Sequence, residues 1–336
     1  MIPPSQTHPP TLATRPSAMP PSSPVTTTST ETPSATASPA PLQLTYTVFL
    51  SDDWDELRAI NVGCPHRAPP CMGAPRTLFQ RQNPFAPPSA IAEHAWSPDG
   101  RQVAIAMASY TDDSTDIFLA DASLERIENL RNLTDTPVVW ESDVSWTPDA
   151  TGLVFTRASF TFGPLTLVIG LDGSPLGRLL PSAEELSPSY VRLSPDMTRL
   201  AFLAPAALDL LLYVADFDGT STVPLTETGF VGGAPSFSPD GHLLAYCWLP
   251  EATSHTGQLV VASLDSPTSR IVVTMDAEGC SGPSWSPDGE WIAFAVSRDH
   301  SYGLDIIRPD GTDRLSVDTG QGSAGYPNWR HIPYQP

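Results

Sequence analysis

Lysine is absent from the sequence, in which all 17 basic residues are arginine and stand against 37 acidic residues, for a formal net charge of −20. A chain this acidic repels phosphate backbones and anionic lipid, so neither nucleic acid nor a charged membrane surface is an expected partner. No apolar run approaches the roughly 18 residues that a membrane-spanning helix needs. The sequence itself is therefore predicted to contain no transmembrane segment.

The sequence also lacks the short motifs that mark common enzyme classes. It contains no Gly-x-Ser-x-Gly nucleophile elbow and no phosphate-binding loop of the Gly-x-x-x-x-Gly-Lys-Ser/Thr kind. We therefore expect no cofactor, no metal and no catalytic residue, and an enzyme is the less favoured interpretation.

Apolar residues are scarce in the first 42 residues, where "PPSSPVTTTSTETPSATASPAP" is rich in Ser, Thr and Pro. That composition predicts a disordered tether over 1–42. The first residues lack the basic and apolar regions of a signal peptide. Because such tethers commonly follow an export signal or a lipid anchor, we expect one upstream of Met1 and an extracytoplasmic location, either periplasmic, cell-surface or secreted. The alternative is a disordered tail on a cytoplasmic protein.

The rest of the chain repeats one phrase. It reads "HAWSPDGRQVAIAMASY" from His94 and "PSWSPDGEWIAFAVSRD" from Pro283, with three further copies between them. The copies align on an anchor residue that recurs every 44 to 50 residues, and a sixth anchor follows in "YPNWRHIP". A period of this length is typical of propellers and solenoids. The six anchors are Trp96, Trp146, Leu193, Phe237, Trp285 and Trp329.

Each repeat has the pattern of four short strands. The Ser/Thr-Pro-Asp-Gly sequence after the anchor favours a tight turn, and the strand that follows is a nearly continuous apolar run such as "WIAFAV". A strand of that kind is covered on both faces. No repeat has helical periodicity. We therefore predict an all-β fold, a six-bladed β-propeller of four-stranded antiparallel blades.

The two ends of the repeat region complete each other. Its beginning supplies three strands without an anchor strand, and the C-terminal "YPNWR" supplies an anchor strand alone. We therefore expect a ring closed by the C-terminal strand pairing into the N-terminal blade. The propeller is expected over 43–336, with blade 1 at 43–89 plus 325–332, blade 2 at 93–135, blade 3 at 143–182, blade 4 at 190–228, blade 5 at 234–277 and blade 6 at 282–318.

The phrase "PSWSPDGEWIAF", followed by a third strand that ends in Asp-Gly, resembles the TolB-like repeat, also described as WD-like, over about Thr45 to Ile332. Ala150 and Met197 stand where that family has Gly, and Leu193 replaces its Trp, so the turn of blade 4 is expected to be the loosest. TolB-like relatives act as interaction platforms in the cell envelope, and the resemblance implies the same role here.

The two faces of a propeller carry different loops. The Ser-Pro-Asp-Gly turns share one face, here called the turn face, and their aspartates are expected to bond to the local backbone. The other face, here called the loop face, carries the loops between second and third strands and between blades. Its aromatic and acidic residues suit the core and rim of an interface, unless the acids only solubilise the chain and the aromatics only seal the blade ends. The turn aspartates are Asp99, Asp149, Asp196, Asp240 and Asp288, and the candidate ligand-binding residues are Asp53, Trp54, Tyr110, Asp112, Trp140, Glu141, Phe160, Glu184, Phe230, Tyr302 and Tyr326.

Four cysteines are placed where two disulfides could form. Cys64 and Cys71 bracket a segment of the long loop in blade 1, whereas Cys247 and Cys280 lie toward the loop face of adjacent blades. Two bridges suit an exported protein, although sequence alone does not fix their connectivity. The alternative is four free thiols in a cytosolic chain.

The function predicted from these features is that of an exported, monomeric, non-catalytic propeller that binds a protein, a peptide or a glycan on its loop face. The alternative is a carbohydrate-active enzyme of the polysaccharide-lyase kind. Such an enzyme would use loop-face acids with His94, His255 and His300, which fall in loop-face segments. Their spacing does not indicate that they converge on a metal.

Overall fold

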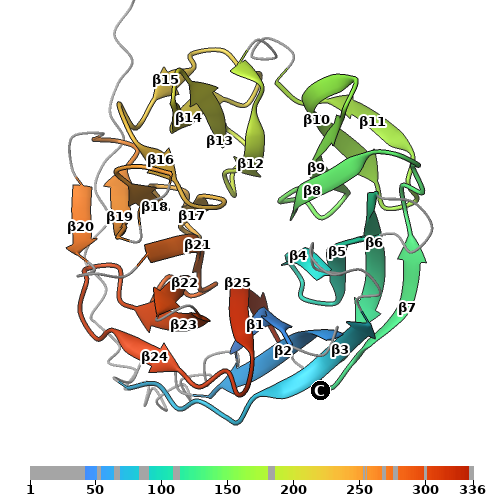
Figure 1. Cartoon of the computed structure of the whole chain (residues 1–336), viewed down its shortest axis with the longest axis vertical. Coiled ribbons are helices and arrows are strands. Elements are labelled where there is room, and N and C mark those ends of the chain that lie inside the picture. The colour runs from blue at the N-terminus through green and yellow to red at the C-terminus, as the bar shows by residue number, and fades with distance from the viewer. Residues whose placement is uncertain are drawn as a thin grey trace, which may run out of the picture. The chain divides into compact units, whose positions relative to one another are not determined.

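The computed structural model describes residues 42–50, 54–63, 69–82, 91–108, 114–180, 186–252, 254, 256–266, 270–274, 279–298 and 301–332. Across these ranges the chain forms β-strands and no α-helix (Figure 1), so the predicted all-β class is confirmed. None of the described segments forms a helix with the length and apolar character needed to span a bilayer.

Two sheets have four strands each. The first has the order β25-β1-β2-β3, so the last strand of the chain pairs antiparallel with the first. Its strands are β25 (Ser323–His331), β1 (Leu42–Phe49), β2 (Trp54–Val62) and β3 (Arg76–Gln82). The second has the order β21-β22-β23-β24, with β21 (Gly279–Trp285), β22 (Ile292–Arg298), β23 (Ser301–Ile307) and β24 (Leu315–Val317).

Two larger sheets each join two four-stranded groups. In one, a single parallel pair, Thr115 with Trp140, connects β6 to β8. Its strands are β4 (Ile91–Trp96), β5 (Gln102–Ala108), β6 (Thr115–Ala122), β7 (Ile127–Asn132), β8 (Trp140–Trp146), β9 (Gly152–Ser159), β10 (Phe162–Gly170) and β11 (Pro175–Arg178).

In the other large sheet the short strand β16 lies between β14 and β18, a link that the repeat pattern does not predict. The strands are β12 (Ser189–Leu193), β13 (Arg199–Ala206), β14 (Asp209–Asp216), β15 (Val223–Pro224), β16 (Phe230–Val231), β17 (Ser236–Phe237), β18 (Leu243–Leu249), β19 (Gln258–Ser263) and β20 (Arg270–Thr274).

The apolar second strands of the repeats are buried along their length, as their continuous runs predict. Five consecutive residues are buried in each of β5, β9, β13 and β22. The covering comes from both sides, because the buried apolar residues form six clusters, each built from two neighbouring strand groups. One of these clusters joins the group of β1, β2 and β25 to that of β22, β23 and β24. In Figure 1 the strands of 42–332 lie around a common centre.

The tight turns after the anchors have the predicted hydrogen bonds. The Ser97 hydroxyl donates to the Asp99 carboxylate at 2.7 Å, and the same carboxylate accepts the Arg101 amide at 3.0 Å. Equivalent bonds reach Asp149, Asp196, Asp240 and Asp288 from the Ser or Thr two residues earlier. Ala150 and Met197 adopt φ of 58° and 57° in the position that Gly occupies elsewhere, so both turns keep the same backbone at a conformational cost.

Candidate functional site

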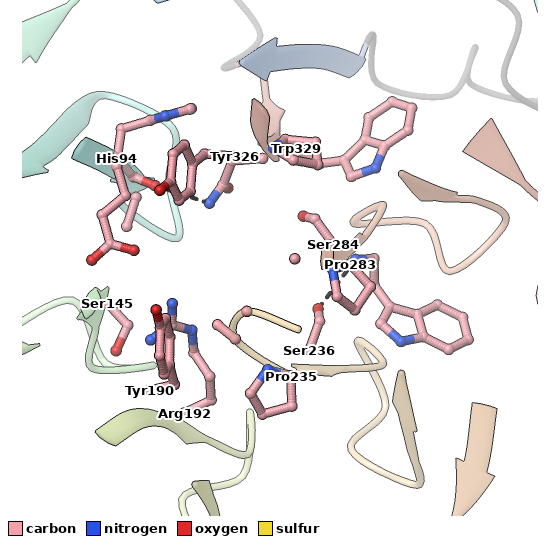
Figure 2. Close-up of a pocket in the computed structure, with 18 of the residues that line it drawn as sticks. His94, Ser145, Tyr190, Arg192, Pro235, Ser236, Pro283, Ser284, Tyr326 and Trp329 are labelled. Carbon is pink, nitrogen blue, oxygen red and sulfur yellow. Dashed lines mark hydrogen bonds between the residues drawn. The ribbon is translucent and has the colours of Figure 1, made fainter. Parts of the chain in front are cut away.

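The innermost strands of all six strand groups line one cavity of about 680 Å³. These strands are β4, β8, β12, β17, β21 and β25, which are also the innermost strands in Figure 1. A concave site with apolar walls and a few convergent polar groups is where a ligand is most often bound. Figure 2 shows His94 and Tyr326 together on one wall, with Pro283 and Ser284 across the cavity.

The innermost strands are distorted three residues before the anchor. Register shifts occur there in β4, β8, β12, β21 and the β1–β25 pair. Asp143, Tyr190 and Tyr326 occupy this position with φ of 61°, 52° and 51°. Large residues seldom adopt such angles, and bulges of this kind redirect side chains next to binding sites. The distortion therefore sets which side chains surround the cavity.

Two carboxyl groups lie buried beside the cavity. Glu93 lines it and accepts the Val144 amide at 2.8 Å, while Asp143 accepts the Tyr190 amide at 3.3 Å. Burial, followed by repulsion from Asp143, raises the pKa of Glu93 to about 8, and burial raises the pKa of Asp143 as well. Arg192 opposes both shifts, but its guanidinium donates to the main-chain oxygens of Asp143 and Val191, each at 3.0 Å. If both carboxyl groups were ionised, their two negative charges would face the single positive charge of Arg192.

Aromatic rings surround the same opening. Tyr190, Tyr302, Tyr326 and Phe49 all line the cavity, and Phe49 meets Tyr326 edge to face with ring centroids 6.3 Å apart. Repulsion from Asp143 and burial raise the pKa of Tyr190, and burial followed by repulsion from Glu93 raises that of Tyr326. Both phenols are thus neutral and close to the carboxyl pair.

His94 lies in strand β4, 4 % exposed, and not in an open loop as expected from the sequence. Its Nε2 is 2.8 Å from the Thr45 hydroxyl, which also accepts from the Trp96 indole at 2.7 Å and donates to the Asn328 carbonyl at 2.8 Å. Burial lowers the pKa of His94 to about 3, so the ring is neutral. Its Nδ1 is buried without a hydrogen-bond partner.

The structure brings two predicted loop-face residues to the cavity. Tyr302 at the start of β23 and Tyr326 in β25 line it with 54 % and 46 % of their surface exposed. Glu141 lies elsewhere, with its side chain fully buried and ion-paired to Arg157 at 2.6 Å. The Glu141 carboxylate therefore faces the protein interior and not solvent.

Other predicted residues form a separate aromatic group or lie apart. Phe160, 86 % exposed in the β9–β10 turn, meets Trp140 edge to face with centroids 4.5 Å apart. Trp54 and Phe230 are half-buried at the starts of β2 and β16. The candidates Asp53, Tyr110, Asp112 and Glu184, like His255 and His300, lie outside the described residues.

A disulfide connects two neighbouring strand groups, as predicted. It joins Cys247 of β18 to Cys280, which lies within β21 and not ahead of it, with Cα atoms 5.6 Å apart. Cys71 is also disulfide-bonded, and its predicted partner Cys64 lies outside the described residues. The described part of the chain contains no free cysteine.

Most of the distinctive cavity residues were not among the candidates predicted from the sequence. Glu93, Asp143, Tyr190 and Tyr326 share one position, three residues before the anchor, and only Tyr326 was a candidate. Aligning the repeats at that position would have exposed an unusual set of polar and aromatic residues. Among the described residues, no group of three or more His, Cys, Asp or Glu side chains is placed to hold a metal ion.

Comparison with known proteins first defines the class of fold. The structure matches TolB of Acinetobacter baumannii with a TM-score of 0.66 at 21 % identity, covering 86 % of this chain and 66 % of that one. A TolB-like protein of Agrobacterium tumefaciens gives 0.60 at 17 %, over 88 % and 99 % of the two chains. A chain of a nidogen/laminin complex gives 0.61 at 10 %, over 87 % and 99 %. The fold is thus that of a β-propeller.

Comparison of the sequence with known proteins finds TolB homologues among its relatives. The chain is 29 % identical to a TolB homologue of Chlorobaculum tepidum over 126 residues, which are 37 % of this chain and 28 % of that protein. It is 29 % identical to the TolB homologue of Chlorobium luteolum over 112 residues, 33 % of this chain and 24 % of that protein. An uncharacterized protein of Agrobacterium fabrum is 24 % identical over 267 residues, 76 % and 84 % of the two chains. No family model matches.

The resemblance to TolB-like β-propellers is therefore confirmed. The matched segment spans only about a quarter of the length of the two TolB homologues.

Proposed function

We propose that this protein is a non-catalytic binding propeller that engages a protein or peptide through the loop face and the mouth of the central cavity. The observation that carries the proposal is the cavity itself, rimmed by the exposed rings of Tyr302 and Tyr326. Exposed aromatic side chains at a concave opening are typical of interface hot spots. A glycan remains the alternative ligand at the same face, since aromatic rings also suit sugars.

We further infer that the six strand groups form a closed ring with the predicted blade boundaries. Two observations support closure: all six innermost strands line one cavity, and an apolar cluster joins the first strand group to the last. A closed ring gives every blade two neighbours, which removes exposed faces, and it makes the cavity a defined site on a rigid scaffold.

An extracytoplasmic location is part of the proposal. The Cys247–Cys280 disulfide supports it, because such bonds persist mainly in oxidising compartments. The likeness to TolB propellers supports a role in the cell envelope, and a monomer that presents the loop face to its partner would suffice for that role.

Comparing how much partner the parent protein and a loop-face variant capture tests this function. Replacing Trp54, Phe160 and Tyr302 with Ala should abolish crosslinked capture of a protein from envelope extracts or medium, with less than about 1 kcal/mol lost in stability because these side chains are exposed or half-buried. The matched control is Phe217→Ala, an aromatic 37 % exposed in the turn between β14 and β15. Equal capture by the triple variant and the parent would refute a loop-face binding site, and capture of glycans alone would replace a protein partner with a sugar.

A further inference from the structure

We propose that the central cavity binds a positively charged nitrogen group of the partner, an alkylammonium or a guanidinium, against Glu93 and between the rings of Tyr190 and Tyr326. This subsite deepens the proposed binding function and rests on it. Glu93 would contact the cation, and Asp143 would act from behind as a second negative charge.

Two buried carboxyl groups beside the cavity have one nearby cation, Arg192, between them. Glu93 and Asp143 are 8 % and 5 % exposed, and neither forms an ion pair within 4.0 Å in the described part of the chain. The nearby Arg192 gives its hydrogen bonds to main-chain oxygens. Burying two carboxyl groups without pairing is costly unless a cation arrives or a proton is retained.

Two tyrosine rings lie beside those carboxyl groups. Tyr190 and Tyr326 line the cavity together with Glu93, and the Tyr190 amide donates to Asp143 at 3.3 Å. Repulsion from both acids contributes to the raised pKa of each phenol. Figure 2 shows Tyr326 and Tyr190 on the same side of the cavity, with Arg192 next to Tyr190. Aromatic faces attract cations, most strongly where water is excluded.

A residue of the same wall, His94, has an unsatisfied hydrogen-bond acceptor. The Thr45 hydroxyl has one proton, and the Asn328 carbonyl at 2.8 Å can only accept it. The contact between Thr45 and His94 Nε2 is therefore an N–H donated by the histidine, which leaves the lone pair on Nδ1. That Nδ1 is buried without a donor in a residue that lines the cavity. An N–H donor of the ligand would satisfy this acceptor, whereas the unpartnered indole N–H groups of Trp285 and Trp329, also on lining residues, call for an acceptor elsewhere on the ligand.

These features favour an organic cation over a metal ion. A metal ion needs several convergent ligands, and no such group of His, Cys, Asp or Glu exists among the residues that the structure describes. Aromatic rings contribute nothing to the coordination of a hard metal ion, whereas they cover the faces of a guanidinium.

Titration calorimetry with small probes tests the subsite on the full-length protein. N-acetyl-arginine amide and N-acetyl-lysine amide should bind. The citrulline analogue, equal in shape to arginine but uncharged, should bind at least about tenfold more weakly. Affinity should rise as the pH increases from 7 to 9, because the proton on Glu93 competes with the cation. The charged and titratable groups that act on Glu93 are Asp143, Arg192, Tyr190 and Tyr326. The adjacent residue His94 stays neutral over this range.

Glu93→Gln should lower the affinity for the arginine probe about tenfold and remove its pH dependence. Glu128→Gln, at an exposed ion pair with Arg126, is the matched control and should bind like the parent. Equal binding of the citrulline probe, unchanged binding by Glu93→Gln, or binding of calcium chloride with no binding of either organic cation would overturn the subsite. None of these results would by itself abolish partner capture through the loop-face aromatics, so failure of the subsite and failure of the proposed function are distinguishable.

Discussion

Glu93 carries a proton in the folded protein at a pH where an ordinary glutamate has lost it. Its pKa is about 8 in the folded chain, because of burial first and of Asp143 second, against 4.5 for an ordinary glutamate. The folded state therefore binds more protons than the unfolded state between about pH 4.5 and 8, and stability falls as the pH rises through that window.

The measurable consequence is a pH slope that Glu93→Gln removes. The parent should lose up to about 1.4 kcal/mol of unfolding free energy per pH unit across this window from Glu93. The variant keeps a neutral side chain of the same shape and should show a flatter profile in urea unfolding between pH 5 and 9. Parallel profiles for the two proteins would contradict the raised pKa.

At the residue scale the turn aspartates were predictable and the buried charges were not. Asp99 and Asp288 sit in a local sequence that dictates their hydrogen bonds. Arg330 shows the opposite case: it is 1 % exposed, lies over the Trp96 ring at 4.2 Å, and donates to the Gly100 oxygen at 2.7 Å. Its acceptors come from residues more than 200 positions earlier, so no local sequence pattern predicts these contacts.

Strand β25 connects the C-terminal end of the described chain to its first strand, β1. Trp329 is 5 % exposed in the apolar cluster shared with β22 and β23, and it lies opposite Leu44 of β1. Trp329→Ala should destabilise the protein by about 3–5 kcal/mol, the usual range for a large buried aromatic. Thermal unfolding measures this loss. Trp140→Ala, at a half-buried tryptophan of β8, is the comparison and should cost less; equal losses would mean that β25 has no special role.

At the element scale the repeats predicted the strands well and the joints between them poorly. The apolar runs and turn sequences located β5, β9, β13, β18 and β22, because both signals are local. The link through β16 and the bulges three residues before each anchor depend on contacts between strand groups. The cavity lining was equally hard to predict from the sequence, since its residues come from six separate repeats.

The molecule as a whole is held by a covalent bond between neighbouring strand groups as well as by packing. Replacing Cys247 and Cys280 together with Ala should lower the unfolding free energy by about 2–4 kcal/mol, since the bond closes a loop of 33 residues. Urea unfolding measures the loss. The Cys64→Ser, Cys71→Ser double variant, with a far shorter loop, should lose less. Thiol titration of the denatured, unreduced parent should detect no free thiol, and four reactive thiols would contradict both bridges and export.

The pairing of β1 with β25 also fixes how the protein responds to a pull on its ends. Leu42 lies opposite His331, so the two ends of the described chain leave the sheet at the same side of an antiparallel ladder. Tension between them would load the hydrogen-bonded pairs one after another, from Leu42 inward, and not all at once as in shear. The β1–β25 pair would therefore separate one hydrogen-bonded pair at a time at low force, beginning where Arg330 is anchored to Gly100 and Ser123.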